Sequence, residues 1–132
     1  MTFVSFASGS SGNCYLLTEG RAAVLLDTGI SLRRIKTCLA RRALTPDDLS
    51  AVLITHEHSD HVAGLPMLLK YYKNVKVYAP QTVAHALERA AAGLEGRIVP
   101  IPVGESVALK NFTLTAFPTM HDTPESVGYV LT

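Results

Sequence analysis

The sequence predicts a single α/β domain, because strand-like and helix-like stretches alternate along its 132 residues. At the start, short apolar stretches are separated by a Gly/Ser/Asn-rich run, which is typical of strands joined by turns. After Ser31, apolar residues recur at helical spacing, as in Leu32, Ile35 and Leu39. The continuous apolar run Ala51–Ile54 is typical of a strand covered on both faces. No linker, repeat or low-complexity segment divides residues 1–132.

Each element follows from the same patterns. The expected strands are Thr2–Ser8, Cys14–Glu19, Ala22–Asp27, Ala51–Ile54, Val75–Ala79, Glu105–Lys110, Phe112–Phe117 and Val127–Leu131. One helix is expected to begin after an N-cap at Ser31, a second to span Val62–Tyr72, and a third to span Thr82–Ala92 and end at Gly93. A hairpin turn is expected at Asn111.

The composition is that of a globular protein without a strong charge. Hydrophobic residues make up 48% of the chain, and 12 Lys and Arg stand against 11 Asp and Glu, which excludes a natively disordered chain. The formal net charge of +1 gives no general argument for a nucleic-acid or anionic-membrane partner, so such a partner has to be argued from a site. The first ten residues lack the basic and long apolar regions of a signal peptide, and no apolar run approaches 18 residues, so a cytoplasmic location is expected.

The two cysteines do not indicate a metal site or a disulfide framework. Cys14 and Cys38 lie in different segments and lack the spacing of paired thiolate ligands. We expect both to be free buried thiols.

A group of metal-ligating residue types follows the buried strand. Four of them occur within six residues in Thr55-His56-Glu57-His58-Ser59-Asp60-His61, an arrangement expected by chance in roughly 3 of 10,000 such sequences. A helix N-terminus with a capping aspartate and solvated histidines would be the structural alternative. The carboxyl end of a strand in an α/β sheet is, however, where ligand sites are commonly found.

The spacing within this run predicts two metal positions. His56 and His58 are two residues apart in extended backbone, whereas Asp60 and His61 are adjacent and point in different directions. A zincin is excluded, because its second histidine would have to stand four residues after the first, where Asp60 is found. Imidazole and carboxylate without thiolate favour zinc, with manganese or iron as alternatives.

A further ligand for the first metal has to come from elsewhere in the chain. His121 is the better candidate, because it follows the expected strand Phe112–Phe117 and so lies near a strand end. His85 lies in an ordinary helical stretch, and we interpret it as a helix histidine without a ligand role.

Taken together, these residues resemble the metallo-β-lactamase superfamily over nearly the whole chain. The resemblance is carried by the strand Val24–Gly29, by His56-x-His58-x-Asp60-His61 and by His121. The opening Phe6–Leu16 and the ending His121-Asp122 with Val127-Gly128-Tyr129 closely resemble the YycJ (WalJ) branch of that superfamily.

The resemblance implies a fold and a set of roles. The implied fold is half of an αββα sandwich, with a mixed sheet and helices on one face. It implies that His56, His58 and His121 bind a first zinc, and that Asp60 and His61 form part of a second site. It also implies that Asp27 orients a metal ligand through a hydrogen bond.

The sequence also departs from the family. The later half of the family fold supplies an aspartate that bridges the metals and a final histidine, and the 132 residues stop before both. We therefore expect a C-terminally truncated domain or a reduced relative, with a second site that is incomplete. An uncovered half-fold face would favour a homodimer. Asp122 is interpreted as a turn or cap residue.

The expected function is that of a metal-dependent hydrolase that uses a zinc-bound hydroxide, with Asp60 as the catalytic residue that positions it. The YycJ-like resemblance implies a phosphodiesterase or DNA exonuclease. A lactonase or thioesterase, or a non-catalytic metal-binding module, remains open. We expect the isolated chain to hold at most one metal firmly and to show little turnover.

Two weaker candidates for binding sites remain. The loop containing Ser10 and Asn13 is a candidate for substrate contact, although a turn at the rim of the site is the simpler interpretation. The basic residues of the first expected helix and the group Lys70, Lys73 and Lys76 are interpreted mostly as solvated faces.

Overall fold

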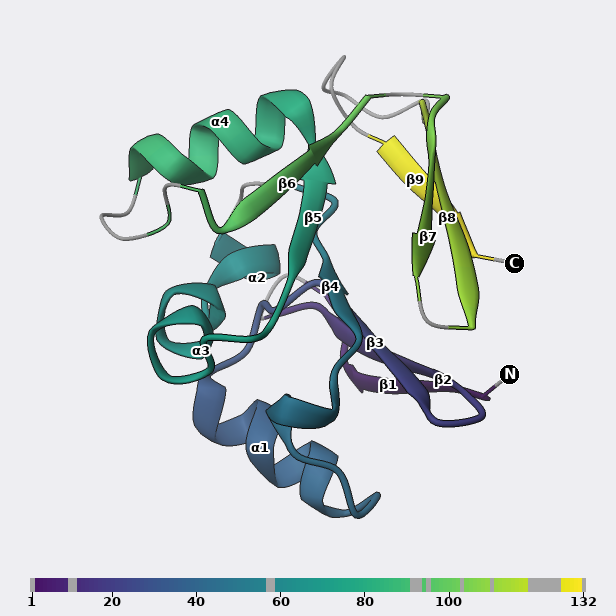
Figure 1. Ribbon diagram of the computed structural model, residues 1–132. Helices are drawn as coiled ribbons and strands as arrows, with labels where there is room; N and C mark the ends of the chain where they lie inside the picture. Colours follow the sequence, from purple (N-terminus) through teal and green to yellow (C-terminus); the bar gives the residue numbers. More distant parts are fainter. Residues whose placement is uncertain are drawn as a thin grey trace.

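The computed structural model of the chain describes residues 2–9, 12–56, 59–90, 94, 96–102, 104–109, 111–118 and 127–131. Two β-sheets and a layer of helices make up this part of the chain (Figure 1). None of the helices in the described ranges has the length and apolar character needed to cross a lipid bilayer.

The larger sheet is mixed and has six strands in the order β1-β2-β3-β4-β5-β6. Its strands are β1 (Thr2–Ala7), β2 (Cys14–Glu19), β3 (Ala22–Leu26), β4 (Ala51–Leu53), β5 (Val77–Pro80) and β6 (Ile98–Ile101). The first three strands pair antiparallel, and β3 to β6 pair parallel. Parallel neighbours end at the same edge of the sheet, so the carboxyl ends of β3 and β4 lie side by side.

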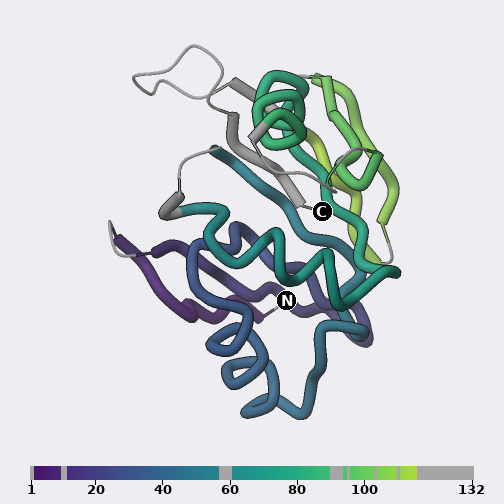
Figure 2. The backbone as a smooth tube through the Cα atoms, turned by 90° about the vertical axis from the view of Figure 1, so that its left-hand side faces the viewer, coloured from purple at the N-terminus to yellow at the C-terminus, as the bar shows by residue number. Residues whose placement is uncertain are grey.

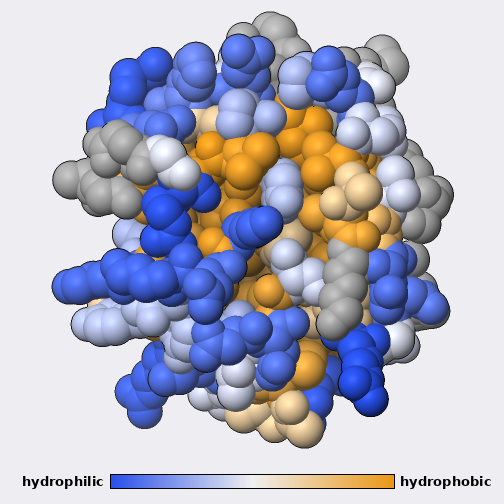
Figure 3. Space-filling model, viewed as in Figure 1, coloured by the Kyte–Doolittle hydropathy of each residue, from blue (hydrophilic) through white to orange (hydrophobic). Residues whose placement is uncertain are grey.

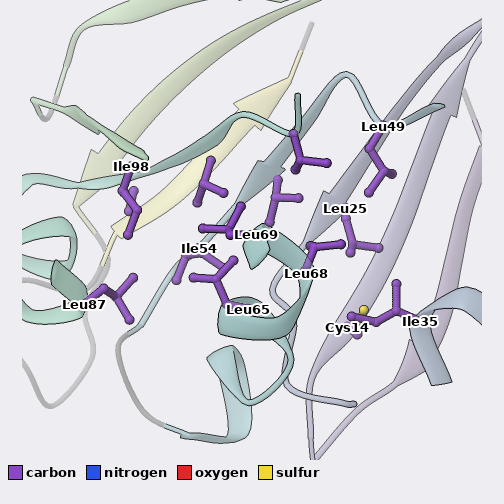
Figure 4. Packing of buried hydrophobic residues seen from close by; sticks show 14 of the residues in the cluster. Cys14, Leu25, Ile35, Leu49, Ile54, Leu65, Leu68, Leu69, Leu87 and Ile98 are labelled. Carbon is purple, nitrogen blue, oxygen red and sulfur yellow. The ribbon is translucent and has the colours of Figure 1, made fainter. Parts of the chain in front are cut away.

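Helices cover one face of this sheet. They are α1 (Leu32–Ala40), α3 (Leu65–Tyr71) and α4 (Gln81–Ala90), with the short α2 (Ser59–Val62) and the 3-10 turn η1 (Pro46–Asp48) between strands. Figure 2 looks onto this face, where α4, α3 and α1 follow one another from top to bottom. The helices bury Ile35, Leu65 and Leu68 against this face of the sheet. There these residues pack with Leu25 of β3 and with Ile54, which directly follows β4 (Figure 4).

A second sheet covers part of the opposite face. It consists of β7 (Ser106–Leu109), β8 (Phe112–Pro118) and β9 (Val127–Leu131), all antiparallel. Phe112 and Leu114 of this sheet pack against Val24, Leu53 and Tyr78 of the larger one. Both faces of the central strands are therefore buried, which is the arrangement that the continuous apolar run of β4 predicts. The predicted α/β class, with a mixed sheet and helices on one face, is confirmed.

The first helix and the β7–β8 hairpin begin and turn where the sequence predicts. The Ser31 side chain accepts a hydrogen bond from the backbone N–H of Arg34 at 3.2 Å, as an N-cap does. Asn111 adopts a left-handed backbone with φ of 62°, which asparagine tolerates better than most residues. Its side chain also donates a hydrogen bond to the carbonyl of Glu19 at 3.0 Å, so it ties the hairpin of the second sheet to the first sheet.

The prediction of a single helix over Val62–Tyr72 is wrong. The structure has two helices, α2 and α3, with a break at Ala63 and Gly64. The backbone N–H of Gly64 donates to the carbonyl of Thr28 at 2.8 Å. A Cβ atom on Gly64 would lie 2.1 Å from the carbonyl oxygen of Ile30, so the break follows from a close approach of two loops that periodicity does not reveal.

Strand β6 and the turn η1 do not follow from the sequence patterns. Pro100 lies inside β6 and makes that stretch unlike a regular strand, yet β6 is an edge strand, where proline is tolerated because one side needs no ladder hydrogen bond. At η1, Asp48 accepts a hydrogen bond from the backbone N–H of Thr45 at 2.8 Å. This is a capping interaction within a turn too short to show a hydrophobic period.

The two cysteines are free but differ in burial. Cys14 is fully buried at the start of β2, whereas Cys38 on α1 is only half-buried, so the expectation of two buried thiols is wrong for Cys38. Burial, followed by the nearby charge of Asp27, raises the pKa of the Cys14 thiol to about 12. The thiolate form of Cys14 is therefore scarce at neutral pH.

The close approach at Gly64 predicts a large effect of a single methyl group. Gly64→Ala should lower the free energy of unfolding by about 1–3 kcal/mol, since either the Ile30 loop or the start of α3 must move. Urea unfolding measures this loss against the unmodified chain. Gly96→Ala shows the cost of a left-handed backbone without a clash, because Gly96 has a φ of 75° but no heavy atom within 4 Å of the position that a Cβ would take. Unchanged stability of Gly64→Ala would contradict this account.

The difference between the thiols predicts selective modification. At pH 8, a thiol reagent should modify one cysteine per native chain rapidly and both cysteines in denaturant, because reaction requires the thiolate. The variant Cys38→Ser should lose the rapid phase. Rapid modification of this variant in its native state would show that Cys14 is not protected.

Candidate metal centre

Asp27 lies at the carboxyl end of β3 with its side chain buried. Its backbone has a φ of 59°, a left-handed conformation that is uncommon for residues other than glycine. The backbone N–H of Asp27 donates to the carbonyl of Leu53 at 2.7 Å, which fixes the end of β3 against the end of β4. Only 3% of the residue is exposed. The turn therefore directs a carboxylate across the end of β4.

This carboxylate is held by three donors. Oδ1 accepts a hydrogen bond from the backbone N–H of Thr55 at 2.8 Å, and Oδ2 accepts one from the Thr55 hydroxyl at 2.7 Å. Oδ2 also lies 2.7 Å from Nδ1 of His61. A buried carboxylate is costly unless it is hydrogen-bonded, and hydrogen bonds to charged groups are worth about 1.5–3 kcal/mol each. The network thus links β3, the β4 end and α2.

The hydrogen bonds assign the tautomer of His61. An ionised carboxylate only accepts hydrogen bonds, so Nδ1 of His61 must carry the proton that faces Asp27. In a neutral imidazole the lone pair then lies on Nε2, which is the atom through which a histidine oriented by a carboxylate binds a metal.

The same reasoning extends through Thr55 to His56. The Thr55 hydroxyl has one hydrogen, which it donates to Asp27, so toward Nδ1 of His56 at 2.9 Å it must act as acceptor. His56 therefore also carries its proton on Nδ1 and its lone pair on Nε2. The rings of His56 and His61 lie with their centroids 4.6 Å apart and their planes at 42°. One carboxylate and one hydroxyl thus leave the lone pair of both rings on Nε2.

Backbone contacts hold His61 and the neighbouring loops in place. The carbonyl of His61 accepts a hydrogen bond from the backbone N–H of Thr28 at 2.7 Å, and the carbonyl of Asn13 accepts one from Gly29 at 2.8 Å. The loop after β3 thus contacts both α2 and the β1–β2 loop. The sequence patterns predict no role for Thr28 or Thr55, although a hydroxyl directly before the first histidine of the motif is visible in the sequence.

Asn13 closes the β1–β2 loop on itself. Its side chain accepts from the backbone N–H of Gly9 at 3.2 Å and donates to the carbonyl of Gly9 at 2.9 Å. Its Oδ1 also accepts a hydrogen bond from the Tyr15 hydroxyl at 3.3 Å. These contacts support a turn at the rim of the site, and a substrate contact of Asn13 stays a prediction.

The other predicted site residues are placed only in part. The structure describes Asp60 as a backbone position in α2, whereas Ser10, His58 and His121 lie outside the described residues, as does Asp122. Among the residues that are described, no group of three potential ligands forms a metal site. His85 is exposed on α4, in agreement with its interpretation as an ordinary helix residue. The ligand roles of the histidines and of Asp60 therefore stay predictions.

The donor set nevertheless fits a metal of the kind predicted. Both described histidines are oriented for Nε2 coordination, and the second-site candidates combine imidazole with carboxylate. The buried Cys14 thiol, with its pKa raised to about 12, stays protonated and does not compete as a thiolate. Zinc accepts nitrogen and oxygen ligands of this type.

Comparison with known proteins identifies the family. Residues 7–132 match the family model of the metallo-β-lactamase superfamily. The chain belongs to this superfamily. Its fold is similar to that of the solved Rm3 metallo-β-lactamase, with a TM-score of 0.79 and 22% identity, covering 98% of this chain and 53% of that one.

Several curated relatives are similar in sequence. The exodeoxyribonuclease WalJ of Streptococcus pneumoniae is 42% identical over 84 residues, or 64% of this chain and 31% of the relative. The exodeoxyribonuclease YycJ of Bacillus anthracis is 30% identical over 129 residues, or 96% and 48%. A hydroxyacylglutathione hydrolase of Pectobacterium carotovorum is 34% identical over 82 residues, or 62% and 28%. The matched part of this metallo-β-lactamase superfamily chain thus spans less than half the length of each of these relatives.

The hydrogen-bond network predicts that Asp27 controls metal affinity without binding the metal. Asp27→Asn should weaken zinc binding by about 10- to 100-fold, because the amide no longer selects the Nδ1–H tautomer of His61. Competition with a zinc indicator measures this. Asp47→Asn, on the exposed turn η1, is the matched control and should leave the affinity unchanged. Equal affinities of the two variants would contradict the assigned role.

Proposed function

We propose that the protein is a zinc-dependent hydrolase of phosphodiesters and acts as a DNA exonuclease. The observation that carries the proposal is the hydrogen-bonded group Asp27, Thr55, His56 and His61, which orients two histidines of the His-x-His-x-Asp-His motif for metal binding. Membership of the metallo-β-lactamase superfamily supports the hydrolase class. The two relatives described as exodeoxyribonucleases support the substrate.

The residues of this chain divide the work as follows in the proposed mechanism. His56, His58 and His121 would hold a first zinc, and Asp60 with His61 would contribute to a second site. When bound, zinc lowers the pKa of its water to about 7 and stabilises developing negative charge. Asp60 would orient the attacking water toward phosphorus. Asp27 and Thr55 keep the protons of His61 and His56 on Nδ1, so that Nε2 of each ring remains a ligand atom.

Carbonyl substrates are the competing possibility, because the same chemistry hydrolyses lactones and thioesters and one relative is a hydroxyacylglutathione hydrolase. The nuclease proposal is preferred because WalJ and YycJ have higher identity to this chain than hydroxyacylglutathione hydrolases have over similar shares of it.

An activity comparison tests the proposal. A zinc-loaded form with the full length of the relatives should hydrolyse bis-p-nitrophenyl phosphate and shorten end-labelled DNA, and a chelator should stop both reactions. Loss of a residue that only hydrogen-bonds a metal ligand typically lowers activity by about 10- to 100-fold, and His56→Ala and His61→Ala should lower the rate by more than this. His85→Ala, at an exposed position on α4, should leave the rate unchanged. Efficient hydrolysis of a thioester or lactone with no reaction on either phosphodiester would overturn the proposal.

A further inference from the structure

Helix α1 and the two residues after it expose only positively charged side chains among their charged residues. The stretch from Ser31 to Arg42 contains five basic residues and no acidic one, and all five side chains are exposed. They are Arg33, Arg34, Lys36, Arg41 and Arg42. In the part of the chain that the structure describes, no carboxylate forms an ion pair with any of them. Such unpaired cations produce a local positive potential that the net charge of +1 conceals.

Four of these side chains line a groove between α1 and the edge strand β1. The groove consists of two adjoining hollows of ≈ 560 Å³ and ≈ 330 Å³ that share Phe6, Cys38 and Arg41 as lining residues. Arg33 and Arg34 line the first hollow, and Arg42 lines the second. Hydrophilic residues gather on the lower left of the face in Figure 3, over the region where Figure 1 draws α1 and α3.

The chemistry and length of this arginine groove suit a phosphate backbone. A guanidinium group can form two parallel hydrogen bonds with a phosphate, and it stays charged at any physiological pH. Nine helical residues extend over about 13 Å at 1.5 Å per residue. Adjacent phosphates of one strand lie further apart through space than the rise of about 3.4 Å per nucleotide along a duplex axis, so the groove spans no more than about three consecutive phosphates.

The groove begins next to the candidate metal centre, and this position favours a nucleic-acid substrate over an acidic protein as its ligand. Ser31, at one end of the groove, directly follows the loop Thr28–Ile30. Thr28 of that loop donates to the carbonyl of His61 at 2.7 Å, and Gly29 donates to that of Asn13 at 2.8 Å. A polyanion bound along α1 therefore leads toward the site of hydrolysis, which a nucleic-acid substrate requires and an acidic protein does not.

We propose that the arginine groove between β1 and α1 binds the phosphate backbone of the nucleic-acid strand whose end is hydrolysed at the metal centre. The inference rests on the proposed function for the reaction, but the groove itself binds without metal. It extends the substrate contact beyond the nucleotide at the hydrolysed bond.

Binding without hydrolysis tests the groove separately. Fluorescence anisotropy with a labelled 15-nucleotide oligothymidylate, in chelator and at several salt concentrations, compares two triple variants that remove the same charge. Arg34→Gln/Arg41→Gln/Arg42→Gln should weaken binding by about tenfold or more at low salt and reduce the salt slope by about 2, because about 0.7 of a counterion is released per single-strand phosphate contact. Lys70→Gln/Lys73→Gln/Lys76→Gln, at exposed positions outside the groove, should change little. Thermal melting checks that both variants are folded.

Three results would contradict the proposal that the groove binds a phosphate backbone. These are an equal loss in both variants, unchanged binding by the arginine variant, or tighter binding of poly-glutamate than of the oligonucleotide. Hydrolysis of bis-p-nitrophenyl phosphate, which is too small to reach the groove, should be unaffected by the arginine substitutions. Intact hydrolysis with unchanged oligonucleotide binding would reject the groove alone, whereas arginine-dependent binding with activity confined to thioesters would reject the proposed function alone.

Discussion

The buried carboxylate of Asp27 is the interaction on which the site depends. It lies where β3 and β4 end together, held there by a left-handed turn and by the hydrogen bond from Asp27 N–H to Leu53. Its oxygens accept hydrogen bonds from Thr55 and His61, residues that follow β4 in the sequence. The carboxylate thereby joins two strand ends and a helix, and through its hydrogen bonds it determines which ring nitrogens carry the proton.

The surrounding packing allows this arrangement to persist. Helices cover one face of the six-stranded sheet and the second sheet covers the other, so β3 and β4 cannot shift without disturbing both cores. Thr28 contacts α2 and the start of α3 through His61 and Gly64, and Gly64 has no Cβ because the Ile30 carbonyl occupies that space. Packing therefore fixes the carboxylate, and the carboxylate orients the histidines.

Much of the fold follows from local patterns, whereas contacts between distant residues do not. The apolar runs and the Ser31 cap predict their strands and helix correctly, since burial and capping act on neighbouring residues. The break at Gly64 and the edge strand containing Pro100 depend on the Ile30 loop and on the place of β6 in the sheet. At the site, spacing identifies His56 and His61 as candidates, but the linking role of Thr55 appears only when β3 and β4 are side by side.

The tautomers of the two histidines test the central claim most directly. Long-range ¹H–¹⁵N correlation spectra of the metal-free chain at pH 8 distinguish a protonated ring nitrogen from one that carries a lone pair. We expect His56 and His61 both to be protonated on Nδ1, and Asp27→Asn to remove this preference at His61. Protonation of either ring on Nε2 in the unmodified chain would contradict the claim.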